Sequence, residues 1–83
     1  MKYLVYKHGW DDSDPDASIP FDIEYGTYDT MEEAKKEYQK QVETQDEYLD
    51  RIDSIPSSRT EEDTFTQWKF PKIFFEIGIH TVE

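Results

Sequence analysis

The stretch that decides the fold is residues 29–55, DTMEEAKKEYQKQVETQDEYLDRIDSI. Mainly apolar residues recur along it at spacings of three and four, which is the period of one helix face. The positions of this stripe are Met31, Ala34, Tyr38, Val42 (or Gln41), Gln45, Leu49, Ile52 and Ile55. The spacing predicts one long amphipathic helix that turns its striped side toward the core.

Both ends of this helix carry sequence signals. Thr30 and Glu33 have the spacing of a capping box, and Glu32 and Glu33 lie in the first turn, where the helix dipole favours negative charge. Pro56 sets the predicted end, because proline cannot donate to the helix and disfavours helical geometry at the preceding residue. At 1.5 Å per residue, about 24 residues make a helix of roughly 36 Å. That length crosses a small sheet and allows an overhang.

The segments on either side of the helix have the composition of strands. Residues 2–8, KYLVYKH, alternate with a period of two, and residues 19–26, IPFDIEYG, place Phe21 and Ile23 opposite to Asp22 and Glu24. The ten residues between them, GWDDSDPDAS, contain glycine, proline, serine and four aspartates. This composition predicts a hairpin with a long loop.

After the helix, residues 57–63, SSRTEED, are predicted to form a polar loop. Residues 64–70, TFTQWKF, and residues 72–83, KIFFEIGIHTVE, are predicted as a third and a fourth strand. The fourth strand has one apolar face for the core, made of Ile73, Phe75, Ile77 and Ile79.

The predicted order is therefore β-β-α-β-β, in one small acidic domain that spans residues 1–83. The expected fold class is α+β: a two-layer sandwich with one long helix packed on one face of a mainly antiparallel four-stranded sheet. One helix leaves the other sheet face partly open. Aromatic candidates for that open face or its rim are Tyr3, Trp10, Tyr25, Tyr28, Trp68 and Phe74. Exposed aromatics there would favour dimerisation or a partner site.

The composition is that of a folded protein with few hydrophobic residues. Hydrophobic residues make up 35% of the 83 residues and the mean hydropathy is −0.96, values that suit a disordered chain. Aromatic residues nevertheless reach 16%, and large aromatic side chains supply much buried area. The absence of cysteine excludes disulfides and thiolate metal sites. No apolar run is long enough for a signal peptide or a transmembrane helix, so we expect a soluble, cytoplasmic protein without membrane contact.

The net charge of −11 is concentrated in two places. Residues 11–24 carry −6 and residues 25–50 carry −5, whereas residues 1–10 carry +2. Such a surface repels nucleic acid and anionic membranes and steers toward basic partners. The alternative is that the acidic surface only keeps the protein soluble.

The aspartates between the first two strands resemble part of a calcium-binding loop. Asp12, Asp14 and Asp16 match the first three acidic positions of an EF-hand. The match fails at Ala17, where glycine is needed, and at Ile23, where a bidentate glutamate is needed. We therefore expect no metal site, and weak binding of divalent cations stays an open alternative.

The sequence contains no constellation typical of an enzyme. His8 and His80, the only histidines, would lie close together if the first and last strands pair, but no zinc-binding spacing accompanies them. Nucleophile motifs and glycine-rich phosphate loops are absent from the sequence. A catalytic carboxylate pair would need a desolvated cleft, for which a chain of this size has little room. We expect no enzymatic activity, no cofactor and no metal.

The second half of the helix stretch is the most suggestive feature for function. Its acidic residues recur at spacings of three and four, although like charges at such spacings disfavour a helix. One carboxylate per turn is spaced by about 5 Å, on the order of the roughly 3.4 Å between phosphates along a DNA strand. The predicted partner-binding residues are Glu43, Asp46, Glu47, Asp50 and Asp53, together with Asp11, Asp12, Asp14 and Asp16.

These observations predict a non-enzymatic, acidic protein-binding module. Its sharpest form is a nucleic-acid-mimicking inhibitor that occupies a basic groove on a partner, most naturally a nucleic-acid-binding protein. In size, acidity and lack of cysteine the chain resembles small phage-encoded inhibitors of host defence, although it carries no family motif. The alternative is a small structural or assembly domain that forms a homodimer through its open sheet face. Direct binding of nucleic acid is not expected, because no basic groove is visible in the sequence.

Overall fold

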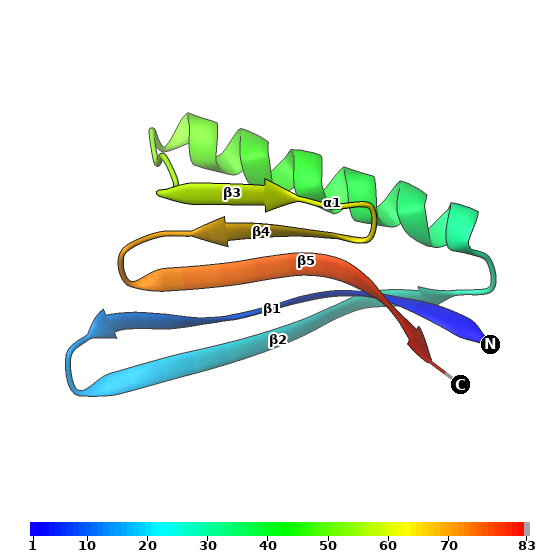
Figure 1. Ribbon diagram of the computed structural model, residues 1–83, viewed down its shortest axis with the longest axis horizontal. Coiled ribbons are helices and arrows are strands. Elements are labelled where there is room, and N and C mark those ends of the chain that lie inside the picture. Colours follow the sequence, from blue (N-terminus) through cyan, green and yellow to red (C-terminus); the bar gives the residue numbers. More distant parts are fainter. Residues whose placement is uncertain (83) are drawn as a thin grey trace.

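The computed structural model describes residues 1–82, which fold into one helix and five strands (Figure 1). The elements are β1 (Lys2–Asp14), β2 (Ala17–Tyr28), α1 (Met31–Arg51), β3 (Ser58–Glu61), β4 (Phe65–Lys69) and β5 (Ile73–Val82). The strands form a single antiparallel sheet in the order β2-β1-β5-β4-β3. The expected α+β class is confirmed. Within the described residues, the helix is too polar to qualify as a membrane span.

The prediction of four strands in the order β-β-α-β-β is wrong, because β3 lies in the segment expected to be a polar loop. All four residues of β3 are exposed and none is apolar, so the segment carries no alternating pattern. Backbone pairing with β4 forms this strand, with Arg59 opposite Trp68. The Arg59 guanidinium also lies 5.6 Å from the centre of the Trp68 ring, a cation–π distance.

The prediction of a long loop between the first two strands is also wrong. β1 extends to Asp14 and β2 begins at Ala17, so only Pro15 and Asp16 separate them. Asp14 Oδ1 accepts a hydrogen bond of 2.9 Å from the backbone N–H of Asp16, and Asp11 Oδ1 accepts one of 2.8 Å from that of Ser13. These short-range bonds are the reason that aspartate favours turns. Residues 10–20, which we call the hairpin arm, therefore form a paired ribbon with a tight turn.

The helix starts as predicted and ends earlier than predicted. Thr30 caps it by accepting a bond of 3.2 Å from the Glu33 N–H. The last helical residue is Arg51, and Asp53 follows the cap with a φ of 54°. The Asp53 N–H bonds to the Asp50 carbonyl and the Ser54 N–H bonds to the Leu49 carbonyl, which is the pattern of a Schellman motif. Because aspartate tolerates the left-handed conformation, this end forms without glycine and well before Pro56.

The core lies between α1 and the middle of the sheet. The helix buries Ala34, Tyr38, Val42 and Leu49, and the sheet buries Val5, Trp68, Phe75 and Ile77. The apolar face predicted for the last strand is confirmed, since Ile73 and Ile79 pack against this cluster as well. The prediction that the end of the stripe faces the core is wrong, because Ile52 is 50% exposed and Ile55 is 88% exposed.

The helix does not follow the sheet evenly from end to end. Figure 1 shows α1 starting close to the ends of β1 and β2 and finishing beside β3. Asp46, in the second half of α1, bonds to Arg59 of β3 and to Trp68 of β4. Those bonds tie the end of the helix to the β3 side of the sheet, and the hairpin arm on the other side is left without a helix over it.

A candidate protein-binding cleft

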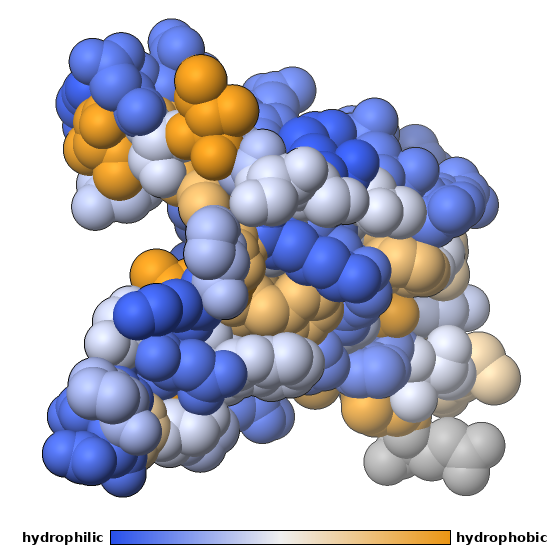
Figure 2. All heavy atoms as spheres, turned by 60° about the vertical axis from the view of Figure 1, so that its left-hand side comes forward, coloured by the Kyte–Doolittle hydropathy of each residue, from blue (hydrophilic) through white to orange (hydrophobic). Residues whose placement is uncertain are grey.

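A cleft separates the end of α1 from the hairpin arm at one end of the molecule (Figure 2). Its volume is about 340 Å³. The end of α1 lines it with Tyr48, Leu49 and the cap residue Ile52. The sheet lines it with Phe21, Ile73 and Phe75, and Phe70 lines it from the turn between β4 and β5. The cleft is therefore mainly apolar, in a protein whose surface is otherwise strongly charged.

Large apolar side chains are exposed at the end of α1 and on β2 next to the cleft residue Phe21. On the helix, Tyr48 is 51% exposed and Ile52 is 50% exposed. On β2, Ile19 is 57% exposed and Ile23 is 43% exposed, and both share the side of the strand that carries Phe21. Scattered single apolar residues are normal on a protein surface, but a grouped set around a concave region is a feature of binding sites.

Lys7 extends into the cleft from β1. Its Nζ donates a hydrogen bond of 3.0 Å to Gln45 Oε1 and lies 5.0 Å from the centre of the Phe75 ring and 5.8 Å from that of Phe21. Burial lowers the pKa of the Lys7 ammonium below its usual value. Within residues 1–82, no carboxylate lies within ion-pair distance of it. Gln45 thus belongs to the sheet-facing stripe, as the spacing predicted, and supplies the polar partner that Lys7 needs.

Gly9 allows Phe21 to reach the cleft. Gly9 lies opposite Phe21 in the ladder between β1 and β2. A Cβ atom at Gly9 would lie 2.9 Å from Phe21 Cζ and 2.0 Å from the Phe74 carbonyl oxygen. Any larger residue would therefore displace the Phe21 ring and the adjacent backbone of β5.

The predicted acidic residues of α1 have different environments. Asp46 Oδ1 accepts a bond of 2.9 Å from the Trp68 indole N–H, and Arg59 Nη2 donates to Asp46 Oδ2 at 2.7 Å. Both carboxylate oxygens of Asp46 thus accept hydrogen bonds within the fold and connect α1 to β3 and β4. Glu43, Glu47 and Asp50 are exposed, and Glu43 lies beside Glu61 of β3 rather than at the cleft.

The predicted acidic residues of the hairpin arm are mostly exposed. Asp12, Asp14 and Asp16 are exposed, and the hydrogen bonds from Ser13 hold the pKa of the Asp11 carboxyl below its ordinary value. The Asp12 N–H donates a bond of 2.7 Å to the Lys72 carbonyl, which fixes the arm to the turn between β4 and β5.

The two acidic segments lie at the same end of the molecule. In Figure 1, the end of α1 and the turn between β1 and β2 both lie on the left, and Figure 2 shows the hollow between them. The end of α1 therefore lies on one side of the cleft. The aspartates of the hairpin arm lie on the other side.

The open face of the sheet carries a polar cluster that the sequence did not reveal. Glu76 accepts bonds of 2.7 Å from the Tyr6 hydroxyl and from Gln67 Nε2, and it lies 3.0 Å from His8 Nε2. Burial and the bond to Glu76 raise the pKa of the Tyr6 hydroxyl. The Tyr6 ring stacks on His80 with 4.2 Å between ring centres. The only signal in the sequence was a glutamate within the apolar alternation of the last strand.

β1 pairs with β5, the condition under which the two histidines were expected to lie close together. In this register His8 lies opposite Glu76, and His80 lies opposite Leu4. Both rings lie against Tyr6. No group of three His, Asp or Glu side chains in the described part of the chain has the geometry to hold a metal ion.

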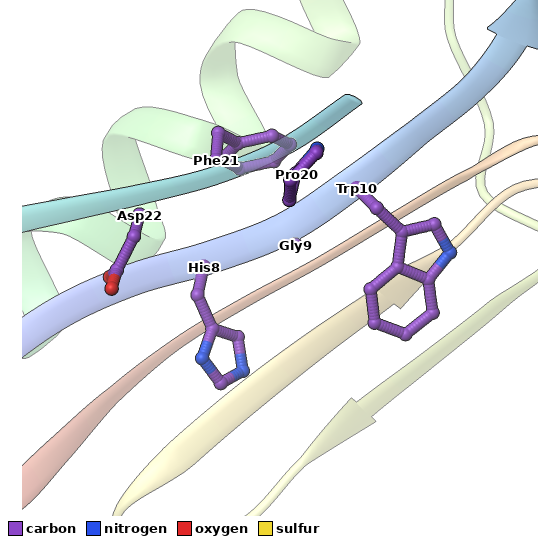
Figure 3. A pocket seen from close by; sticks show the side chains of 6 residues that line it. All are labelled: His8, Gly9, Trp10, Pro20, Phe21 and Asp22. Carbon is purple, nitrogen blue, oxygen red and sulfur yellow. The ribbon is translucent and has the colours of Figure 1, made fainter. Parts of the chain in front are cut away.

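Two of the aromatic candidates for the open face lie there. Trp10 is 45% exposed and stacks on Phe74 with 4.6 Å between ring centres. Figure 3 shows Trp10 and His8 on the same side of β1, beside a shallow depression of about 430 Å³. Trp68, a predicted candidate for the open face, is instead fully buried under the helix. Tyr3, Tyr25 and Tyr28 likewise pack against the core.

Comparison of the chain with protein-family models finds no match, and comparisons with curated proteins and with solved structures find none either.

Proposed function

We propose that this protein is a non-enzymatic acidic module that binds a basic protein partner at the cleft. One observation carries the proposal: an apolar cleft opens between the end of α1 and the hairpin arm, and both of these segments are rich in acidic residues. Apolar surface in the centre with charge at the rim is the usual composition of a protein–protein interface. The net charge of −11 selects for a basic partner.

Asp46 does not belong to the proposed contact surface. A carboxylate that already accepts bonds from Trp68 and Arg59 has little capacity left for a partner. The proposed contacts are exposed carboxylates of the two segments on either side of the cleft: Asp50 and Asp53 at the end of α1, and Asp12, Asp14 and Asp16 on the arm. Glu43 and Glu47 extend the acidic surface along α1.

The nucleic-acid mimic is the sharper form of the same proposal. Glu43, Glu47 and Asp50 follow one another at spacings of four and three on the exposed part of α1, so they form a row along the helix. In this form the partner is a nucleic-acid-binding protein, and the row of carboxylates occupies its basic groove in the place of phosphates.

Dimerisation through the open sheet face is the second candidate. The stacked and exposed pair of Trp10 and Phe74 favours it. The centre of that face favours it less, because Tyr6, Gln67 and Glu76 form a polar network there that is already hydrogen-bonded. A dimer interface normally has its most apolar part at the centre.

The test compares protein capture from a cell lysate by three forms of the protein, at low and at high salt. The cleft variant carries Asp12→Lys, Asp16→Lys and Asp50→Lys. The control carries Glu24→Lys, Glu32→Lys and Glu62→Lys, which change the net charge equally at exposed positions outside the hairpin arm and the second half of α1. We expect the wild type and the control to retain the same basic proteins at low salt, and the cleft variant to lose them. Equal capture by all three forms would contradict the proposal.

A further inference from the structure

We propose that the cleft binds an amphiphilic carboxylate of the size of a medium-chain fatty acid, with its headgroup on the Lys7 ammonium and its chain along the apolar walls. The inference goes beyond the proposed function and does not rest on it. The proposed function concerns exposed carboxylates of the two segments beside the cleft, whereas this inference concerns the residues that line the cleft itself.

The lining of the cleft has a charge opposite to that of the whole chain. Ten of the residues that the structure describes line it, and they include one lysine, Lys7, and no aspartate or glutamate. In the chain as a whole, 20 of 83 residues are acidic. A hollow whose one formal charge is positive favours a negatively charged ligand.

The Lys7 ammonium has no counter-ion in the described part of the chain. Its Nζ donates to Gln45 Oε1 at 3.0 Å, and the ring centres of Phe75 and Phe21 lie 5.0 Å and 5.8 Å from it. All three partners are neutral, and no carboxylate of residues 1–82 lies within ion-pair distance. Burial lowers the pKa of Lys7, the direction expected for a cation without a neighbouring anion. An ammonium has three donors, so donors remain for a carboxylate after the bond to Gln45.

The walls of the cleft suit a hydrocarbon chain. Phe21 and Phe75, whose rings lie beside the Lys7 ammonium, are cleft residues, and Leu49 and Ile52 extend the apolar lining along the end of α1. Figure 2 shows the hollow that these segments border. A volume of about 340 Å³ holds roughly eleven groups at about 30 Å³ each, the share of one water molecule in the liquid. That is about the size of octanoate, with the carboxylate at Lys7 and the chain against the apolar residues.

Other classes of small ligand suit the cleft less well. A cationic ligand would meet Lys7 and no carboxylate in the lining. A neutral apolar ligand would remove water from the ammonium without supplying an opposite charge, which a buried cation needs. A small anion such as acetate has too little apolar surface to offset repulsion by the net charge of −11. The ligand therefore needs both the anionic headgroup and the chain.

The first test titrates isotope-labelled protein with octanoate, octanol and acetate and follows the backbone amide signals by NMR. Octanol has the same chain without the charge, and acetate has the same headgroup without the chain. We expect octanoate to bind about tenfold more tightly than octanol, because it adds a charge-assisted hydrogen bond to Lys7. Acetate should shift no signal, and the octanoate shifts should centre on Lys7 and Leu49. Octanol binding as tightly as octanoate, or shifts centred on the Trp10–Phe74 pair, would overturn the inference.

The second test removes the charge of Lys7. Lys7→Met keeps an unbranched apolar side chain, so octanoate should bind about tenfold more weakly while octanol binds at least as tightly as before. Lys40→Met is the matched control, since it makes the same change in net charge at an exposed position of α1 outside the cleft lining. It should bind octanoate as the wild type does. Equal losses in the two variants, or equal losses of octanoate and octanol in Lys7→Met, would refute the role of Lys7.

A wall variant keeps the inference testable if Lys7→Met does not fold. Ile52 is 50% exposed, so Ile52→Gln should fold, and it should weaken octanoate and octanol alike by about threefold. Ile55→Gln is its control, since Ile55 is 88% exposed and does not line the cleft. Circular dichroism verifies the fold of each variant. Wild-type affinity for octanoate in Ile52→Gln would show that the chain does not lie in the cleft.

Lysate capture separates this inference from the proposed function. If the wild type fails to bind octanoate while the cleft variant loses its captured proteins, the inference is refuted and the proposed function stands. If octanoate binds as expected while all three forms capture equally, the proposed function is refuted and the inference stands. Sedimentation of the free protein as a dimer that Ile52→Gln dissociates would show that a second copy fills the cleft, which overturns the inference.

Discussion

The two halves of α1 have the same apolar spacing and different surroundings. The first half, residues 31–42, buries Ala34, Tyr38 and Val42 against the middle of the sheet. The second half buries only Leu49, while Tyr48 beside it is 51% exposed. The difference shows that a periodic stripe identifies the apolar side of a helix and does not show whether a sheet lies under it.

The largest expected effect comes from matched tyrosine truncations in the two halves. Tyr38 is 6% exposed and its hydroxyl bonds to Thr66, which is fully buried. Tyr38→Ala should lower the free energy of unfolding by about 3–5 kcal/mol, the usual cost of removing a large buried aromatic side chain. Tyr48→Ala should change it by less than about 0.5 kcal/mol. Urea unfolding monitored by circular dichroism measures both, and similar losses would show that the second half is packed as tightly as the first.

Two aspartates in the second half of α1 extend this comparison of packed and exposed positions. Asp46→Ala removes the acceptor of the Trp68 indole N–H, and Trp68 is fully buried. We expect the free energy of unfolding to fall by about 1–3 kcal/mol, the cost of leaving a buried donor unpaired. Asp50→Ala should have almost no effect on stability, since Asp50 is exposed. If the two variants unfold at the same urea concentration, Asp46 does not have the structural role assigned to it.

The smallest expected effect is a change in the pH dependence of stability caused by Lys7, which lies beneath the second half of α1. Burial lowers the pKa of Lys7 in the folded protein, so the unfolded chain binds more protons at pH values between that lowered pKa and the ordinary value near 10.5. Stability of the wild type should therefore rise with pH in that window relative to Lys7→Met, which has no such proton. Thermal unfolding of both proteins from pH 8 to about pH 10.5 measures the difference. Parallel pH profiles would mean that the Lys7 ammonium is fully solvated in the folded protein.

Much of the fold could be predicted because its signals are local. The capping pair of Thr30 and Glu33, the stripe of α1 and the apolar face of β5 depend on residues a few positions apart. β3 could not be predicted, because four exposed polar residues carry no pattern and only pairing with β4 makes them a strand. The aspartates of the hairpin arm predict a loop because aspartate is typical of loops, whereas Asp11, Asp12 and Asp14 belong to β1 and only Asp16 lies in the two-residue turn.

The candidate site was predictable only by residue type. The charge pattern identified the carboxylates of α1 as a group, and nothing in it distinguishes Asp46 from Asp50. The distinction depends on Arg59 and Trp68, which are 13 and 22 residues further along the chain than Asp46. Apolar periodicity placed Ile52 in the core, because a helical pattern contains no information on where the sheet ends.

The sequence by itself determined that this protein has one amphipathic helix, strands with one apolar face, and an acidic surface in two segments. These properties follow from spacing, capping and composition, which act between near neighbours. Only the tertiary structure decided that both acidic segments flank one apolar cleft, that Asp46 is internal and that Lys7 lies against Gln45. Those facts depend on the direction in which α1 crosses the sheet. That direction is set by contacts between residues far apart in the chain, which no local pattern records.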